Sequence, residues 1–239
     1  MKNRRRVRDS SDLITPHGHD QLQLWASRER SSLIIIRGGF ISRVISRDLA
    51  VSIVEAIKTA IIPVVWVLNS RTGEENGVCP SRAPSAIDVL KQLVFQVLQL
   101  NHTLLNQRSA SLNAARYKSA AAEGEWFDLL GAAIAGLPQI YMIIDVEVVG
   151  PEGGSTCSWP KIFMNLFESL LARNVKTNVK VVLVSYRTQL SLEVISTPGI
   201  GSVLNIGKRG GVLKSGRVTK GKKSSRPGKR KTLNVLKNS

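Results

Sequence analysis

The chain has 239 residues, of which 43% are hydrophobic and 21% charged, and its formal net charge at pH 7 is +17. This apolar content can build a substantial core, which excludes a chain that is disordered throughout. No apolar run reaches membrane-spanning length, and the two cysteines, Cys79 and Cys157, lack the spacing of a zinc site or a disulfide framework. Reduced thiols in an intracellular protein are therefore expected, with no membrane partner.

The positive charge is concentrated at the two ends of the chain. Residues 208–239 carry +12 and residues 1–10 carry +4, which leaves +1 for everything between them. The sequence therefore predicts a basic flexible arm over 1–18, one globular domain over 19–207 and a disordered basic tail over 208–239. Apolar residues in the tail are too sparse to offset the entropy cost of ordering it.

Strands and helices alternate within the central domain. A short helix is predicted in "HDQLQLWASRER", ahead of the first strand. The predicted strands are near-continuous apolar runs, as expected of strands buried on both faces of a parallel sheet. They cover residues 33–36, 63–68, 140–144, 180–185 and 202–206.

Between these strands, hydrophobic residues recur at helical spacing in four segments. Ser85 with Asp88 forms a capping-box variant before the second helix, and Pro160 suits the first turn of the fourth. The stretch 112–122 is compatible with one more helix. The predicted buried faces are Leu49, Ala50, Ile53, Val54 and Ile57; Leu90, Leu93, Val94, Val97 and Leu98; Trp126, Phe127, Leu129, Leu130 and Ile134; Phe163, Leu166, Phe167, Leu170 and Leu171.

The alternation predicts an α/β fold, a three-layer α/β/α sandwich with a mostly parallel five-stranded sheet and right-handed crossovers. Ligands of such sheets bind beyond the carboxyl ends of the strands. Three features fall there: the turn Gly38-Gly39 after the first strand, Asp145 after the third, and Ser-Tyr-Arg, ending in Arg187, after the fourth. Glu147 follows Asp145 at a distance of two residues.

In this order, and with Trp25 ahead of the first strand, the features over residues 20–207 resemble the nucleotide-binding core of STAND-class P-loop NTPases. The similarity is greatest to the NACHT-like domains of fungal multidomain proteins. The resemblance implies a sheet of the P-loop NTPase type, with Asp145 as the Walker B residue and Arg187 near the γ-phosphate. ATP or GTP with Mg²⁺ would be the ligand, and Ser46 and Asp145 would hold the metal.

The sequence departs from this family at the P-loop, G-x-x-x-x-G-K-[ST], whose lysine and hydroxyl hold phosphate and Mg²⁺. Counting from Gly38 places Arg43, Val44 and Ile45 at the last three positions. Counting from Gly39 places Val44, Ile45 and Ser46 there, so only the hydroxyl remains. The catalytic acid that usually adjoins the Walker B residue is replaced by Val146. The vestigial nucleotide site consists of Gly38, Gly39, Ser42, Arg43, Ser46, Asp145 and Arg187.

Three functions remain open at this point. The first hypothesis is a non-catalytic, degenerate STAND-type domain that acts as an interaction or signalling module with a protein partner and retains some nucleotide binding. The second is an active NTP-binding switch in which Arg43 or Arg47 replaces the P-loop lysine.

The third is a nucleic-acid-associated protein that binds nonspecifically through its tail. The same basic patch resembles a nuclear-import signal and favours the nucleus over the cytoplasm. Each feature also has a simpler interpretation. The Gly38-Gly39 segment would be a tight strand-to-helix turn without a ligand, and the basic tail would be solvated and have no dedicated partner. The patch consists of Lys220, Lys222, Lys223, Arg226, Lys229, Arg230 and Lys231.

Overall fold

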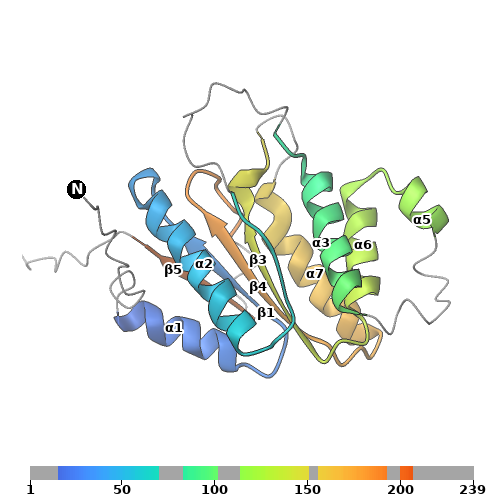
Figure 1. Ribbon diagram of the computed structural model, residues 1–239, viewed down its shortest axis with the longest axis horizontal. Coiled ribbons are helices and arrows are strands. Elements are labelled where there is room, and N and C mark those ends of the chain that lie inside the picture. The colour runs from blue at the N-terminus through green and yellow to red at the C-terminus, as the bar shows by residue number, and fades with distance from the viewer. Residues whose placement is uncertain (1–15, 70–82, 102–113, 151–155, 193–199, 207–239) are drawn as a thin grey trace, which may run out of the picture. The chain divides into compact units, whose positions relative to one another are not determined.

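The computed structural model describes residues 16–69, 83–101, 114–150, 156–192 and 200–206 (Figure 1). The chain divides into two units, residues 1–208 and 209–239, and every described residue belongs to the first. The tail over 208–239, with its basic patch, lies outside the described residues, and so does nearly all of the predicted arm over 1–18.

Five parallel strands form one sheet in the order β2-β3-β4-β1-β5, as the sequence predicts in type and number. Each predicted strand is present, and its ends differ from the predicted ones by at most two residues. The strands are β1 (Ser32–Arg37), β2 (Val64–Val67), β3 (Gln139–Asp145), β4 (Asn178–Ser185) and β5 (Gly201–Asn205).

Helices cover both faces of this sheet, which confirms the three-layer sandwich (Figure 1). On one face lie α1 (Pro16–Ser27) and α2 (Arg43–Thr59). On the other lie α3 (Ala86–Leu100), α6 (Glu123–Ile134) and α7 (Trp159–Ala172). The short helix α5 (Ala114–Ser119) falls within the stretch that was compatible with a helix. The connection from β1 leaves on the α2 face, whereas those from β2 and β3 return on the opposite face, so these crossovers share one hand.

The core has two halves because successive strand residues point to opposite faces. Leu33 and Ile35 pack under α3, α6 and α7, whereas Ile34 and Ile36 pack under α1 and α2. The predicted helix faces are largely buried, and the Ser85–Asp88 capping box is present.

One predicted core residue is wrong: Leu171 is 77% exposed. It directly follows buried Leu170 near the C-terminal end of α7, and one residue turns the side chain by about 100° away from the sheet. Pro160 lies in the first turn of the same helix, as predicted.

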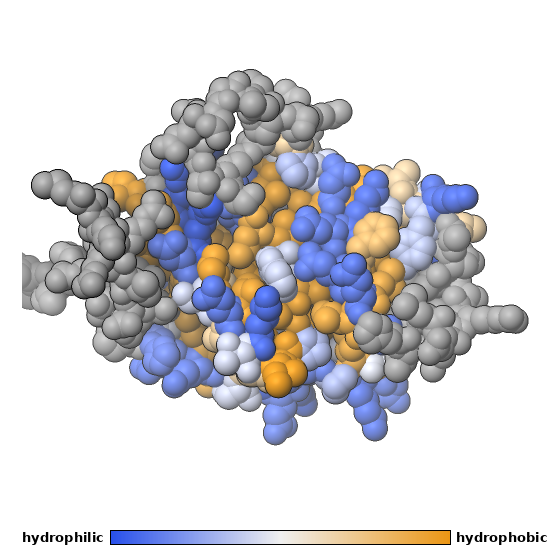
Figure 2. Space-filling model, viewed as in Figure 1, coloured by the Kyte–Doolittle hydropathy of each residue, from blue (hydrophilic) through white to orange (hydrophobic). Residues whose placement is uncertain are grey.

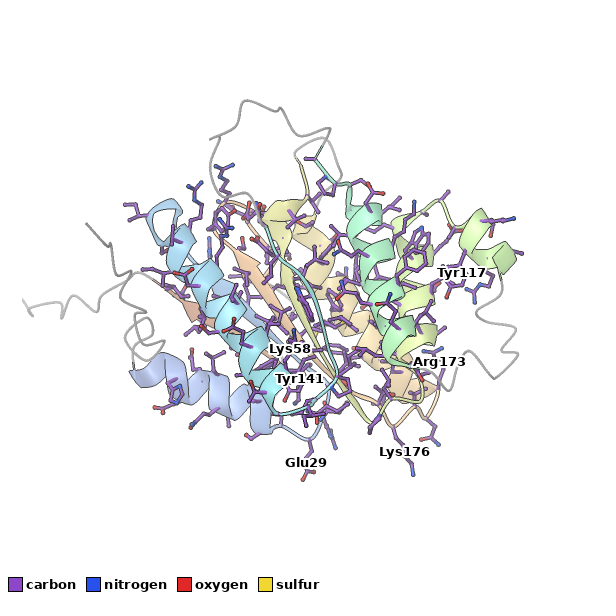
Figure 3. All side chains as sticks on the ribbon, in the orientation of Figure 1. Glu29, Lys58, Tyr117, Tyr141, Arg173 and Lys176 are labelled. Atoms are coloured by element: carbon purple, nitrogen blue, oxygen red, sulfur yellow. The ribbon has the colours of Figure 1, made fainter. Side chains whose placement is uncertain are left out.

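Strand β2 forms one edge of the sheet. In Figure 2, hydrophobic residues occupy the middle of the view, between hydrophilic residues of α2 and α3. The Gln96 side chain of α3 binds this edge, accepting the Trp66 N–H at 3.0 Å and donating to the Trp66 carbonyl oxygen at 2.9 Å. The ammonium group of Lys58, near the end of α2, lies 5.1 Å from the centre of the Trp66 ring (Figure 3).

The amino-terminal ends of the strands lie at one end of the sheet, which Glu29 and Lys176 mark in Figure 3. Lys180 of β4 is fully buried there. Its Nζ donates to the carbonyl oxygens of Trp25, Arg28 and Arg30, and to the Ser32 hydroxyl.

Within the described residues, no helix has the length and hydrophobicity that crossing a bilayer requires.

Candidate functional site

The turn after β1 satisfies its own backbone groups. The Gly38 N–H donates to the Ser185 carbonyl oxygen at 2.8 Å, at the end of the neighbouring strand β4. The Gly39 N–H donates to Ser42 Oγ at 2.8 Å, and the Ser42 N–H donates to the Gly39 carbonyl oxygen at 2.9 Å. The chain then enters a short 3₁₀ helix, η2 (Phe40–Ser42), that continues into α2. The amides of Gly38, Gly39 and Ser42 are thus bound within the protein rather than directed at a ligand.

Two hydroxyls fill the space beside Gly38. A Cβ atom on this residue would lie 2.6 Å from Ser46 Oγ and 2.7 Å from Ser42 Oγ, whereas a Cβ on Gly39 would meet nothing within 4 Å. Ser46 is fully buried, and its hydroxyl donates to the Ser42 carbonyl oxygen at 3.1 Å. Gly38 is therefore required by close packing, and neither glycine has a positive φ.

Asp145 ends β3 and points to the α2 face of the sheet. Its Oδ1 accepts the Glu147 N–H at 3.0 Å, while Oδ2 is buried and makes no hydrogen bond of normal geometry among the described residues. Burial raises the pKa of this carboxyl to about 6, and the nearby Glu147 carboxylate adds to the effect. The Glu147 and Asn69 backbones and the Arg47 charge oppose it.

Glu147 has a role that its sequence position did not reveal. It lies in the 3₁₀ helix η4 (Val146–Val148), and its Oε1 accepts the N–H groups of Tyr186, Arg187 and Thr188 at 3.0, 2.7 and 2.8 Å. Ser185 Oγ lies 3.3 Å from the same oxygen and donates to the Thr188 carbonyl oxygen at 2.5 Å. The side chain thus joins the end of β3 to the loop after β4.

Two adjoining cavities open at the carboxyl ends of β2, β3 and β4. One, of about 310 Å³, is lined by Asp145, Arg47 and Trp66, among others. The other, of about 590 Å³, is lined by Glu147, Tyr186 and three arginines: Arg43, Arg47 and Arg187. Arg47, Leu68 and Asn69 line both, so we treat the two as one cleft. Its size suits a small ligand.

The cleft brings together some of the predicted site residues and excludes others. Arg43, Arg47, Asp145 and Arg187 line it, although they come from three separate segments of the chain. Gly38, Gly39, Ser42 and Ser46 do not line either cavity. The strand order explains this separation, because β4 lies between β1 and β3 and sets Asp145 two strand spacings, about 9.5 Å, from the line of β1.

The residues of this cleft fit phosphate better than they fit a complete magnesium site. Three guanidinium groups suit phosphate oxygens, which they can bind in bidentate geometry. For Mg²⁺, Asp145 Oδ2 offers one buried carboxylate oxygen, but Ser46, the second predicted ligand, is turned to the Ser42 carbonyl. No cluster of three metal-ligating side chains occurs in the part of the chain that the structure describes.

Trp25, which contributed to the family resemblance, lies away from the cleft. Its indole N–H donates to the Ser32 carbonyl oxygen at 3.2 Å, and its ring packs edge-to-face on Tyr141 at 5.7 Å between centroids. These contacts place this α1 side chain in the core that α1 and α2 form with the sheet.

A scan against protein-family models and a search of curated proteins find no match to this chain.

Proposed function

We propose that the domain is a non-hydrolysing relative of P-loop NTPases that binds a phosphate-bearing ligand, such as a nucleoside triphosphate, and acts as an interaction or signalling module. The observation that carries this proposal is the convergence of Arg43, Arg47 and Arg187 on one cleft beside the half-satisfied carboxylate of Asp145. The location agrees with the general rule that ligands of open α/β sheets bind beyond the carboxyl ends of the strands.

The arginines provide the positive charge that the P-loop lysine would supply. Val44, which falls at the lysine position when the motif is counted from Gly38, is 57% exposed on the surface of α2, whereas Arg43 and Arg47 of the same helix line the cleft. Guanidinium groups remain charged at any physiological pH and hold planar or tetrahedral oxyanions at fixed angles. Phosphate binding in this proposal therefore depends on side chains rather than on the backbone of the glycine turn.

Hydrolysis requires a group that activates water near the phosphate, and the carboxylates of the cleft do not suit that role. Val146 stands where the catalytic acid usually adjoins Asp145, and in the ligand-free protein Glu147 is held by three backbone amides. Loss of the lysine removes part of the charge neutralisation on which phosphoryl transfer depends. Binding without turnover is the function that this set of residues supports best.

Calorimetric titration of the full chain with ATP, ADP and pyrophosphate, each with and without Mg²⁺, tests the proposal. We expect micromolar to millimolar dissociation constants, weakened about tenfold or more by Arg47→Gln and by Arg187→Gln, because each removes a charged hydrogen bond to phosphate. Arg30→Gln, at the amino-terminal end of the strands, is the matched control and should leave affinity unchanged.

Two results would contradict the proposal in different ways. If no ligand binds at millimolar concentration, the cleft is not a phosphate site. If the pure protein hydrolyses ATP and Asp145→Ala abolishes that activity, the domain is an active enzyme, and the switch hypothesis replaces the non-catalytic one.

A further inference from the structure

The loop after β4 contains a group of backbone donors that converge on one point. The N–H groups of Tyr186, Arg187 and Thr188 follow one another in sequence, and all three donate to Glu147 Oε1 within 3.0 Å. Successive amides that point into one concavity form a nest, which is a general binding site for anions.

The bound carboxylate matches this nest poorly in one respect. Three backbone N–H groups share the single oxygen Oε1. The Ser185 hydroxyl lies 3.3 Å from this oxygen but donates its one proton to the Thr188 carbonyl oxygen at 2.5 Å. A carboxylate oxygen has about two lone-pair directions, so three donors exceed what one oxygen can accept in good geometry. A phosphoryl or sulfate group presents three oxygens on one side and could divide these donors among them.

The nest also faces the arginines. Glu147 and residues 186–188 line the same cavity as Arg43 and Arg47, and Arg187 also donates a backbone N–H to the nest. An oxyanion that replaced the Glu147 carboxylate would therefore contact backbone amides and guanidinium groups together. Glu147 is a side chain of a short 3₁₀ helix, so it could leave the nest by rotation about its own bonds.

We propose that the amides of residues 186–188 form an oxyanion subsite, that the Glu147 carboxylate fills it in the ligand-free protein, and that a phosphoryl group of the ligand displaces it. This inference rests on the proposed function only for the identity of that ligand. The subsite regulates affinity, because a ligand must compete with a tethered anion. It also couples binding to movement, since displacement releases the link between the end of β3 and the loop after β4.

The test compares pyrophosphate binding by the wild-type chain with that by Glu147→Ala and Glu147→Gln, at ionic strength held constant with chloride. Alanine empties the nest, and glutamine retains an uncharged oxygen acceptor. We expect Glu147→Ala to bind pyrophosphate about tenfold more tightly than wild type, with Glu147→Gln between them, because a charged competitor has been removed. Glu168→Ala changes the same charge on the exposed face of α7 and should stay within about twofold of wild type.

The amide NMR resonances of Tyr186, Arg187 and Thr188 report whether pyrophosphate binds in the nest. They should shift when pyrophosphate is added to Glu147→Ala, which distinguishes binding in the nest from a general loss of repulsion. If Glu147→Ala does not fold, the affinity and the amide shifts of Glu147→Gln decide the question.

The outcomes separate this inference from the proposed function. Equal pyrophosphate affinity in wild type and both Glu147 variants, or unchanged amide resonances at residues 186–188, would overturn the subsite. Binding that depends on Arg47 would still support the proposed function in that case. Conversely, tight binding by Glu147→Ala with no binding of phosphate ligands by the wild-type chain would support the subsite and overturn the proposed function.

Discussion

Lys180 and Asp145 are both buried, but the protein satisfies them to different degrees. Lys180 Nζ has four oxygen acceptors, among them the Arg30 carbonyl oxygen at 2.9 Å and the Ser32 hydroxyl at 3.1 Å. Asp145 has one paired oxygen and one that makes no hydrogen bond within the described part of the chain. Burial, assisted by the Arg28 charge, lowers the pKa of Lys180 to about 8, whereas burial raises the pKa of Asp145 to about 6. A buried charge with all its hydrogen bonds made, such as Lys180, suits a structural role. A buried charge with one oxygen left without a hydrogen bond, such as Asp145, suits a binding site.

Asp145→Asn should stabilise the domain at neutral pH. The folded pKa of about 6 exceeds the unfolded value of about 3.9, so the folded state binds more protons between these values. The resulting stability is complete below about pH 4 and is lost as pH rises through 6, by up to about 3 kcal/mol. Asparagine removes this loss while keeping an acceptor for the Glu147 N–H.

Urea denaturation between about pH 4 and pH 8 measures this effect. The exposed Asp128 of α6 offers a matched control, because Asp128→Asn should follow the wild-type curve. Parallel stability curves for wild type and Asp145→Asn would show that Asp145 ionises normally in the folded protein.

Lys180→Met should strongly destabilise the amino-terminal edge of the sheet. The substitution keeps an apolar stem of similar length but leaves buried carbonyl oxygens of the connection between α1 and β1 without their donor. Each buried acceptor left unsatisfied costs about 1–3 kcal/mol, so we expect a loss of at least about 3 kcal/mol. Hydrogen exchange should accelerate over residues 25–32. Substitution of the exposed Lys176 by Met should change neither the stability nor the exchange rates. Normal exchange in Lys180→Met would mean that other contacts hold this connection.

At the scale of elements, the two glycines of the turn between β1 and α2 differ in how tightly the surrounding atoms pack against them. Gly38→Ala should cost about 1–3 kcal/mol, because the new methyl group would collide with the hydroxyls of Ser42 and Ser46. Gly39→Ala should change stability by less than about 0.5 kcal/mol, since its Cβ enters open space and its φ is not positive. Equilibrium denaturation of both variants measures the difference. Equal costs would show that the turn is not packed as described.

The edge strand β2 depends on one side chain of α3. Gln96→Ala should cost about 1–2 kcal/mol and promote self-association, because it exposes the N–H and carbonyl oxygen of Trp66 to other strands. Gln96→Glu is the matched variant, since its carboxylate still accepts the N–H but cannot donate to the carbonyl. We expect light scattering to show larger species for alanine than for glutamate. Monomeric behaviour of both variants would mean that the edge is protected by other means.

The elements were predictable from sequence because their signals are local. A continuous apolar run identifies β1, and a 3.6-residue period identifies α2 and α3. The order of the strands was not predictable in this way, because it depends on contacts between distant segments. The same reason explains why the sequence indicates no role for Glu147: its partners at 186–188 follow about forty residues later. Lys180 lies in a predicted strand, but its acceptors lie in α1, in the connection that follows it and at the start of β1, far earlier in the sequence.

At the scale of the molecule, charge divides the chain into parts that can act separately. Residues 11–207 carry a net charge of +1, but three arginines gather on one cleft within the described part of that segment. Residues 208–239 carry +12. A small anion would therefore bind the cleft arginines, and a nucleic acid would bind the basic residues of 208–239. The charges of one region can be removed by substitution while those of the other stay in place.

The seven-residue basic patch provides the last test. Its replacement by glutamine in the full chain, at Lys220, Lys222, Lys223, Arg226, Lys229, Arg230 and Lys231, should weaken DNA and RNA binding without sequence preference. The slope of log affinity against log salt should fall by up to about 6, at about 0.9 for each phosphate that the tail no longer neutralises. Pyrophosphate affinity should not change, because the cleft arginines are intact, whereas Arg47→Gln should show the reverse pattern. If the patch variant binds nucleic acid with an unchanged salt slope, the positive surface that binds nucleic acid lies elsewhere, and the hypothesis that the tail acts on nucleic acid fails.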